Sequence, residues 1–243
     1  MPAVWVALGA LLGLAAGSFI ATLVIRWPAG RSVVHGRSAC DACAARLGLR
    51  DLIPLASYVA ARGRCRACGR AIDRLHPAIE AVAAGIGATA LAVAPGWAGL
   101  VGAVFGWMLL ALAALDYRHF WLPDRLTLPL AALGLAVGAT GIGPSLATRA
   151  IGMITGWLAL RLVALVYSQL RRRDGLGGGD PKLLGALGAW LGAAALPWVV
   201  LLAALGGLAV VAIRAVSGRP VAATDRLPFG TFLAAAGFIV WLT

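Results

Sequence analysis

The chain has 243 residues, of which 61% are hydrophobic and only 12% are charged, a composition unlike that of an ordinary soluble domain. Its net charge of +12 would suit nucleic-acid binding, but no recognition motif accompanies the charge, so we expect no nucleic-acid partner. The composition instead predicts an all-α protein embedded in a lipid bilayer.

Hydrophobic segments of roughly 17–25 residues cross a bilayer as helices. We predict about eight, at residues 2–25, 77–94, 97–115, 127–142, 146–170, 183–195, 197–213 and 228–243. The first lacks the basic leading region of a cleavable signal peptide, so we expect it to remain as a transmembrane anchor. The spacings Gly152-x3-Gly156 and Gly188-x3-Gly192 allow close packing between helices.

Positive charge marks one set of loops. Nineteen of the 21 basic residues fall in four connections, at 26–76, 116–126, 171–182 and 214–226, which alternate with loops that carry almost none. Because Lys and Arg accumulate in cytoplasmic loops, we expect these four connections to face the cytoplasm. We divide the chain into an N-terminal part, residues 1–94, and a C-terminal part, residues 95–243.

The first basic connection, residues 26–76, holds all four cysteines, as the pairs Cys40-x2-Cys43 and Cys65-x2-Cys68. Thiolates at this spacing can close a tetrahedral Zn²⁺ site, and a reducing cytoplasm argues against disulfides. Redox-active pairs or idle thiols are the alternatives. Four protein ligands leave no open coordination position, so the zinc would be structural and would help this insert to fold.

Two aspartates lie at polar ends of hydrophobic segments. Asp116 ends the third segment, and Asp180 follows three glycines (residues 177–179) just before the sixth. An ionisable group beside hydrocarbon is costly and is a functional-site candidate by default. Two close carboxyl groups can share a proton, so that one acts as base on water and the other as acid. The pair predicts an aspartic protease, although Asp116 alone could pair with Arg118 and Asp180 alone could cap a helix.

Three other ionisable residues have competing interpretations. Asp124 lies at the expected start of the fourth segment, where helix capping is favoured over catalysis. Lys182, the only lysine in the chain, could tune the Asp180 carboxyl group or contact lipid phosphates. Glu80, near the start of the second segment, could pair with an arginine or receive a substrate amine.

Five motifs occur in a fixed order along the chain. They are Gly17-Ser18-Phe19-Ile20 leading to Arg26-Trp27-Pro28, the paired cysteines followed by Pro77-Ala78-Ile79-Glu80, Asp116 followed by Pro123-Asp124, Gly177-Gly178-Gly179-Asp180-Pro181-Lys182-Leu183, and Leu227-Pro228-Phe229-Gly230. Together they resemble the motifs of the bifunctional type IV prepilin peptidases, also called leader peptidase/N-methyltransferases. One departure is Ala21, where the opening motif of that family usually has Asn.

The resemblance implies an enzyme of the bacterial inner membrane that cuts the leader from type IV prepilins or type II secretion pseudopilins at the cytoplasmic face. It also implies methylation of the new N-terminal residue with S-adenosylmethionine as donor, in the part that carries the cysteines. Asp116 and Asp180 would be the proteolytic pair, and four motif residues would support them: Gly177, Gly179, Lys182 and Asp124. Nothing in the sequence indicates where S-adenosylmethionine binds.

Two other classes of function remain open at this point. One is an intramembrane protease of the presenilin type, but this chain lacks the Tyr-Asp and Pro-Ala-Leu motifs of those enzymes. The other is a non-enzymatic membrane assembly factor or transporter with a metal-bound loop. In a transporter we would expect polar residues spread through the helix interiors rather than gathered at one end.

Overall fold

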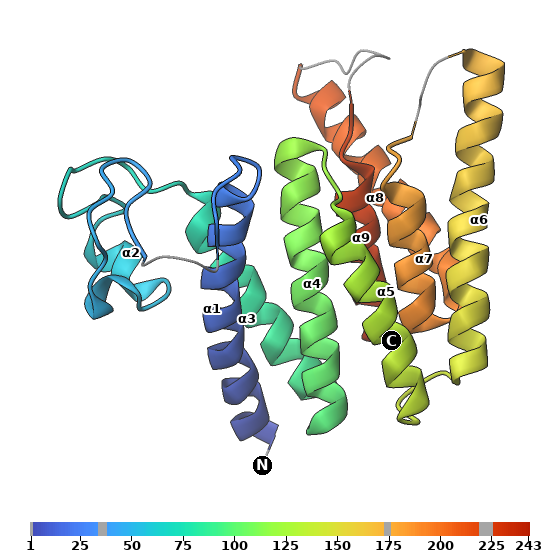
Figure 1. The fold of residues 1–243 in the computed structure, drawn as a ribbon, viewed down its shortest axis with the longest axis horizontal. Coiled ribbons are helices and arrows are strands. Elements are labelled where there is room, and N and C mark those ends of the chain that lie inside the picture. Colours follow the sequence, from blue (N-terminus) through green and yellow to red (C-terminus); the bar gives the residue numbers. More distant parts are fainter. Residues whose placement is uncertain (1, 34–37, 173–175, 219–225) are drawn as a thin grey trace. The chain divides into compact units, whose positions relative to one another are not determined.

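The computed structural model describes residues 2–33, 38–172, 176–218 and 226–243, and within these ranges the regular elements are helices (Figure 1). The long helices are α1 (Pro2–Arg26), α3 (Leu75–Val93), α4 (Trp97–His119), α5 (Asp124–Ala139), α6 (Leu146–Arg171), α7 (Asp180–Leu191), α8 (Leu196–Val216) and α9 (Phe229–Trp241). Short elements are η1 (Leu49–Asp51), α2 (Ala56–Ala60) and η2 (Ala193–Ala195). The predicted all-α class is confirmed.

Each predicted hydrophobic segment coincides with one long helix. Five stretches in the described ranges are long and apolar enough to cross a membrane: α1, α3, α4, α6 and α8 with the η2 turn before it. Helices α5, α7 and α9 have only 16, 12 and 13 residues. The structure therefore supports a multi-pass membrane protein with five candidate spans.

Two helix boundaries differ from prediction and change the setting of the aspartates. Helix α4 continues to His119, so Asp116 lies inside its last turn rather than at its end. Helix α7 begins at Asp180 and ends at Leu191, earlier than predicted, because Gly192 has a φ of +80°, which other residues rarely adopt.

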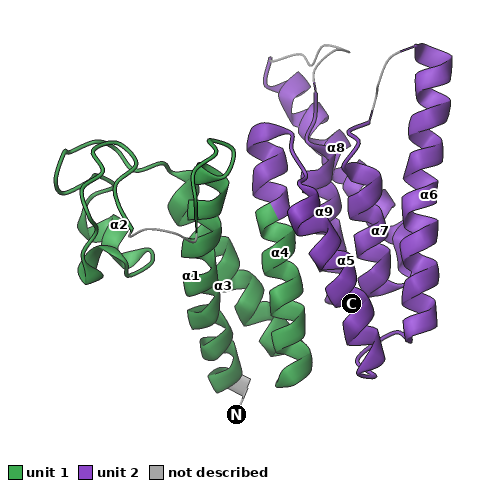
Figure 2. Ribbon diagram, viewed as in Figure 1, with its two compact units in different colours: residues 1–111 green, residues 112–243 purple. Residues whose placement is uncertain are grey.

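The chain divides into two compact units, residues 1–111 and 112–243 (Figure 2). In the first unit, α1 packs against α3 through small residues. A Cβ atom on Gly9 would overlap the carbonyl group of Gly87, and one on Gly13 would overlap that of Ala83. The two backbones are therefore in direct contact, the arrangement that small residues permit between membrane helices.

In the second unit, α6 and α7 meet in the same way, through the two glycine pairs whose spacing allows close packing. A Cβ atom on Gly152 would lie 2.5 Å from the carbonyl oxygen of Gly188, and one on Gly156 would lie 2.7 Å from that of Leu184. In α7 all residues except Lys182 and Leu191 are buried. A helix enclosed this completely can be short, because neighbouring helices rather than lipid cover its sides.

A buried arginine ties α5, α6 and α7 together. Arg149, on α6, is 2% exposed, and its guanidinium donates hydrogen bonds to four carbonyl oxygens. These belong to Gly134 at 3.1 Å, Ala189 at 3.2 Å, Pro144 at 2.9 Å and Ile142 at 2.6 Å. A charge placed among lipid-spanning helices is tolerated only with such partners, and here they fix the position of α7.

Replacing Gly87 by Ala should destabilise the first unit by about 1–3 kcal/mol, because the new methyl group has no room against the α1 backbone. Gly85 lies two residues earlier in α3, and a Cβ atom there would have no other atom within 4 Å, so Gly85→Ala is the matched control. The control should be neutral or gain up to about 1 kcal/mol from better helix propensity. Unfolding of both variants in detergent measures this, and equal stabilities would contradict the proposed backbone contact.

Candidate active site

Asp116 is held in the last turn of α4 by the start of α9. Its carboxyl group is buried, and Oδ2 accepts a hydrogen bond from the Thr231 backbone N–H at 2.8 Å. The Thr231 hydroxyl lies 3.2 Å from the same oxygen and 3.0 Å from the carbonyl oxygen of Ala113. These contacts fix the position of Oδ2.

Asp180 is the first residue of α7 and is also buried, at 5% exposure. Its Oδ2 accepts the N–H of Gly177 at 3.1 Å, while its own N–H donates to the Gly177 carbonyl oxygen at 3.1 Å. The carboxyl group thus turns back onto the glycine loop and does not cap α7, which corrects that alternative. A Cβ atom on Gly177 would approach Oδ2 to 3.1 Å, so the loop needs a small residue there.

The two carboxyl groups influence each other electrostatically. Burial, and then the negative charge of Asp116, raise the pKa of Asp180 from 3.8 to about 7, against the opposing effect of the Gly177 N–H. The residues that were singled out by sequence are therefore brought together within the second unit, although 63 residues separate them in the chain. At neutral pH this arrangement can hold one protonated carboxyl group beside one ionised group.

Leu122, in the connection after α4, packs between two glycines of the site. A Cβ atom on Gly179 would lie 2.6 Å from Leu122 Cβ, and one on Gly230 would lie 2.7 Å from Leu122 Cδ1 and 3.0 Å from Asp116 Oδ2. Sequence reasoning missed both Leu122 and Thr231. The motif ending in Gly230 pointed to the right segment, but nothing in it identified the next residue as the partner of Asp116.

Lys182 and Asp124 form an ion pair at the exposed edge of this site. Lys182 Nζ lies 2.7 Å from Oδ1 and 2.9 Å from Oδ2 of Asp124, and both side chains are about half exposed. The prediction that Asp124 caps α5 is wrong, because α5 begins at Asp124 itself and its side chain makes no capping hydrogen bond. Lys182 binds this carboxylate rather than tuning Asp180, and it joins the starts of α5 and α7.

The four cysteines come together in the first unit, as predicted. The sulfur atoms of Cys40, Cys43, Cys65 and Cys68 all lie within 4.8 Å of one another. Each pair sits in a tight turn closed by an isolated β-bridge, Ala39 with Arg46 and Arg64 with Ala71. Four thiols so placed can hold a metal ion, since a tetrahedral site with metal–sulfur bonds of about 2.3 Å needs sulfur atoms roughly 3.8 Å apart.

Backbone donors favour the thiolate form of one cysteine in this cluster, Cys40. The Ala42 N–H lies 3.4 Å from Cys40 Sγ. This N–H and that of Cys43 lower the pKa of the Cys40 thiol to about 7, because they stabilise the thiolate. A thiolate is the form in which cysteine binds metals.

Glu80 connects the cysteine insert to α3. It is 4% exposed, its Oε2 accepts the Leu55 N–H at 2.8 Å, and its Oε1 lies 3.4 Å from His76 Nε2. The structure thus gives Glu80 a histidine and a backbone N–H as partners in place of the predicted arginine. Gly17 of α1 packs on this residue, since a Cβ atom there would lie 2.7 Å from Glu80 Cα. Ala21, the departure in the opening motif, is fully buried on the same helix.

Two stretches of the chain match known protein families. Residues 11–94 match the bacterial peptidase A24 N-terminal domain, and residues 103–212 match the type IV leader peptidase family. No solved structure matches the chain.

Relatives named prepilin leader peptidase/N-methyltransferase cover most of the sequence. The protein of Burkholderia pseudomallei strain 1026b is 44% identical over 86% of this chain and 68% of its own length. That of Aeromonas hydrophila is 40% identical over 85% of this chain and 71% of its own length. That of Dickeya chrysanthemi is 38% identical over 97% of this chain and 92% of its own length.

The cysteine geometry predicts one tightly held metal ion per chain. Cys65→Ser should lower the metal content of the purified protein to well below one equivalent, because a hydroxyl replaces one of four thiolates. Ala67→Ser adds a hydroxyl to the same turn without removing a thiol and is the matched control. Elemental analysis of both variants measures the effect, and an unchanged metal content in Cys65→Ser would contradict the four-thiolate site.

Proposed function

This chain belongs to the type IV leader peptidase family, and from that premise we propose that it is a prepilin leader peptidase and N-methyltransferase. It cleaves the leader of type IV prepilins or of type II secretion pseudopilins at the cytoplasmic face of a bacterial inner membrane. It then methylates the newly exposed N-terminal residue. Family membership argues against the two alternatives, a presenilin-type protease and a non-enzymatic membrane protein.

The observation that carries the peptidase proposal is the buried pair Asp116 and Asp180. Asp116 accepts hydrogen bonds from the Thr231 N–H and hydroxyl, and these donors oppose the effect of burial, which disfavours the ionised carboxyl group. Asp180 accepts a hydrogen bond from the Gly177 N–H, and its pKa of about 7 leaves this carboxyl group about half protonated at neutral pH. We therefore assign Asp116 as the general base and Asp180 as the general acid.

The reaction then needs no metal and no covalent intermediate. Asp116 takes a proton from a water molecule as the water oxygen attacks the carbonyl carbon of the scissile bond, and Asp180 gives its proton to the carbonyl oxygen. When the tetrahedral intermediate breaks down, the proton on Asp116 passes to the leaving amine. Asp180 recovers a proton from the hydroxyl group that becomes the new carbonyl, so both carboxyl groups return to their starting states.

The other motif residues position the two aspartates and take no part in proton transfer. Gly177 gives the backbone N–H that orients Asp180, and Gly179 leaves space for Leu122. The ion pair between Lys182 and Asp124 holds together the two segments that follow the motif aspartates. None of these contacts donates a proton to the reaction.

The remaining assignments concern the membrane and the cofactors. The basic connections orient the protein with its active site toward the cytoplasm, and the substrate reaches it through the bilayer with its own hydrophobic helix. Zn²⁺ suits the four-thiolate cluster, and because that ligand set is closed, its role is structural. S-adenosylmethionine supplies the methyl group. We assign methyl transfer to residues 1–94 and proteolysis to residues 95–243.

Asp116→Asn and Asp180→Asn should each reduce leader cleavage by about 10²- to 10⁴-fold, because an amide can neither take nor give the required proton. Asp124→Asn is the comparison, and it should cost less than about tenfold, since its partner is the exposed Lys182. The mass of a candidate prepilin's N-terminal region, measured after incubation with each protein in membranes, reports leader loss and one added methyl group separately. Full cleavage by Asp180→Asn would refute the assigned pair.

Cleavage should depend on pH through Asp180. Its proton is present below about pH 7 and is lost above that value, so the rate should fall as pH rises from about 7 to about 9. Initial rates across this range measure the profile, and thermal unfolding at each pH controls for loss of structure. A rate that stays constant, or increases, over this range in folded protein would count against Asp180 as the acid.

A further inference from the structure

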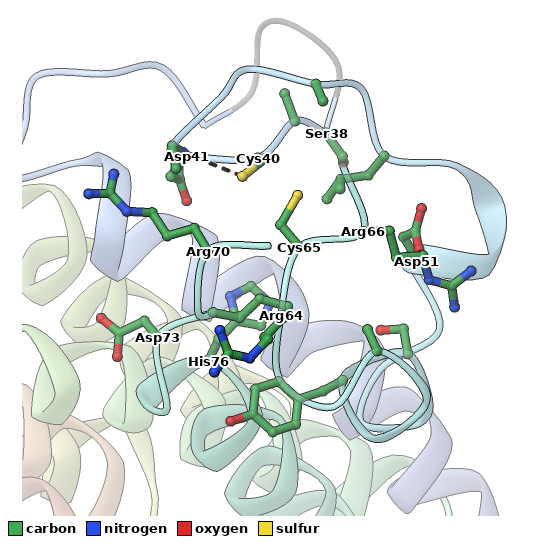
Figure 3. Close-up of a pocket in the computed structure, with 18 of the residues that line it drawn as sticks. Ser38, Cys40, Asp41, Asp51, Arg64, Cys65, Arg66, Arg70, Asp73 and His76 are labelled. Carbon is green, nitrogen blue, oxygen red and sulfur yellow. Dashed lines mark hydrogen bonds and ion pairs between the residues drawn. The ribbon is translucent and has the colours of Figure 1, made fainter. Parts of the chain in front are cut away.

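The first unit contains a cavity of about 470 Å³ with no role in the proteolytic site described above. It lies between the end of α1, the cysteine insert and the start of α3, and Figure 3 shows the residues around it. Cys40 and Cys65 contribute to one wall, and His76 and Glu80 of α3 contribute to another. The volume falls within the range of pockets that hold small organic ligands, roughly 300–1,000 Å³.

The charges around this cavity are concentrated and of both signs. The chain has only nine acidic residues, and all four that belong to the first unit line the cavity: Asp41, Asp51, Asp73 and Glu80. Five arginines line it as well: Arg26, Arg46, Arg64, Arg66 and Arg70. A site for a simple anion would not need the carboxylates, so the lining suits a ligand that carries positive and negative groups together.

Part of this lining is held in place by contacts with neighbouring residues. Asp41 lies 2.9 Å from Arg31 and 3.4 Å from Arg26, and Asp51 lies 3.2 Å from Arg66. Asp73 Oδ1 accepts the Leu75 N–H at 2.9 Å. The carboxylates are therefore oriented before any ligand arrives, which lowers the cost of binding one.

We propose that this cavity binds S-adenosylmethionine, an inference that rests on the methyl-transfer activity proposed above. S-adenosylmethionine carries an α-ammonium, an α-carboxylate, a sulfonium, two ribose hydroxyls and a flat purine. Carboxylates of the lining match the ammonium and the hydroxyls, arginines match the α-carboxylate, and the ring of Tyr58 in the wall offers a surface for the purine. The mixed lining of charges and the Tyr58 ring thus matches the ammonium, the carboxylate, the ribose hydroxyls and the purine of the donor.

The acceptor chemistry fits the wall formed by α3. In the transfer, the neutral N-terminal amine of the cleaved substrate takes the methyl carbon, and the carbon–sulfur bond breaks with its electron pair left on sulfur. The amine releases one proton, and neutral S-adenosylhomocysteine remains. Glu80 and His76 lie 3.4 Å apart in the lining and provide a route by which that proton can leave.

Binding of radiolabelled S-adenosylmethionine by equilibrium dialysis, with the protein in lipid nanodiscs and no prepilin present, tests the site directly. Ala61→Phe places a ring in the cavity lining at the end of α2 and should raise the dissociation constant about tenfold or more. Ala60→Phe, at the neighbouring exposed position outside the lining, is the matched control and should bind as the unsubstituted protein does. Equal binding by both variants would overturn the proposal.

A second pair decides the case if Ala61→Phe fails to fold. Arg70→Ala removes one lining guanidinium and should weaken binding, whereas Arg74→Ala, four residues on and outside the lining, should not. Excess inorganic phosphate should not displace the donor; displacement would identify an anion site and overturn the proposal, as would absence of binding to the folded unsubstituted protein. Leader cleavage, measured after a prepilin is added to separate portions of the same preparations, keeps the two claims apart. Donor binding without cleavage refutes only the peptidase, and cleavage without donor binding refutes only this site.

Discussion

Exclusion of water from two carboxyl groups is the constraint around which the second unit is arranged. Asp180 can retain a proton near neutral pH only while it stays buried beside Asp116. That burial depends on close backbone packing, in which Leu122 fills the space left by Gly179 and Gly230. The glycines of the motifs are thus needed for packing around the acids as much as for loop conformation.

Much of the architecture followed from residue patterns whose physical basis is local. Hydrophobic length predicted every long helix, and cysteine spacing predicted a cluster that the fold assembles. The features that the sequence did not predict depend on tertiary contacts. Thr231 becomes the partner of Asp116 only because α9 starts beside the end of α4, and Lys182 reaches Asp124 across 58 positions of sequence. No periodicity or propensity encodes such distances, so local reasoning gave Asp124 a capping role that tertiary structure does not use.

The insert in the first unit is stabilised mainly by polar contacts, unlike the second unit. Its insert has few buried apolar side chains, and polar contacts take their place: thiols that gather at one point, ion pairs such as Arg66 with Asp51, and the Glu80 carboxylate that accepts the Leu55 N–H. A small polar segment without a sizeable hydrophobic core needs cross-links of this kind to adopt one structure. The same scarcity of apolar residues leaves room for a polar cavity inside the insert.

The four carbonyl partners of Arg149 have a consequence for how this protein can diverge. Every acceptor belongs to the main chain, so its oxygen remains in place whichever side chain the residue carries. The side chains of Ile142 and Pro144 can therefore change without loss of these hydrogen bonds, whereas Gly134 and Gly138 must stay small, because a Cβ atom there would lie 2.6 Å from Trp190 Cδ1 and from Arg149 Cδ, respectively. Lysine has the same charge but a single compact ammonium group, which cannot reach acceptors spread over a planar fork. The same geometry thus tolerates change at Ile142 and Pro144 but not at Arg149.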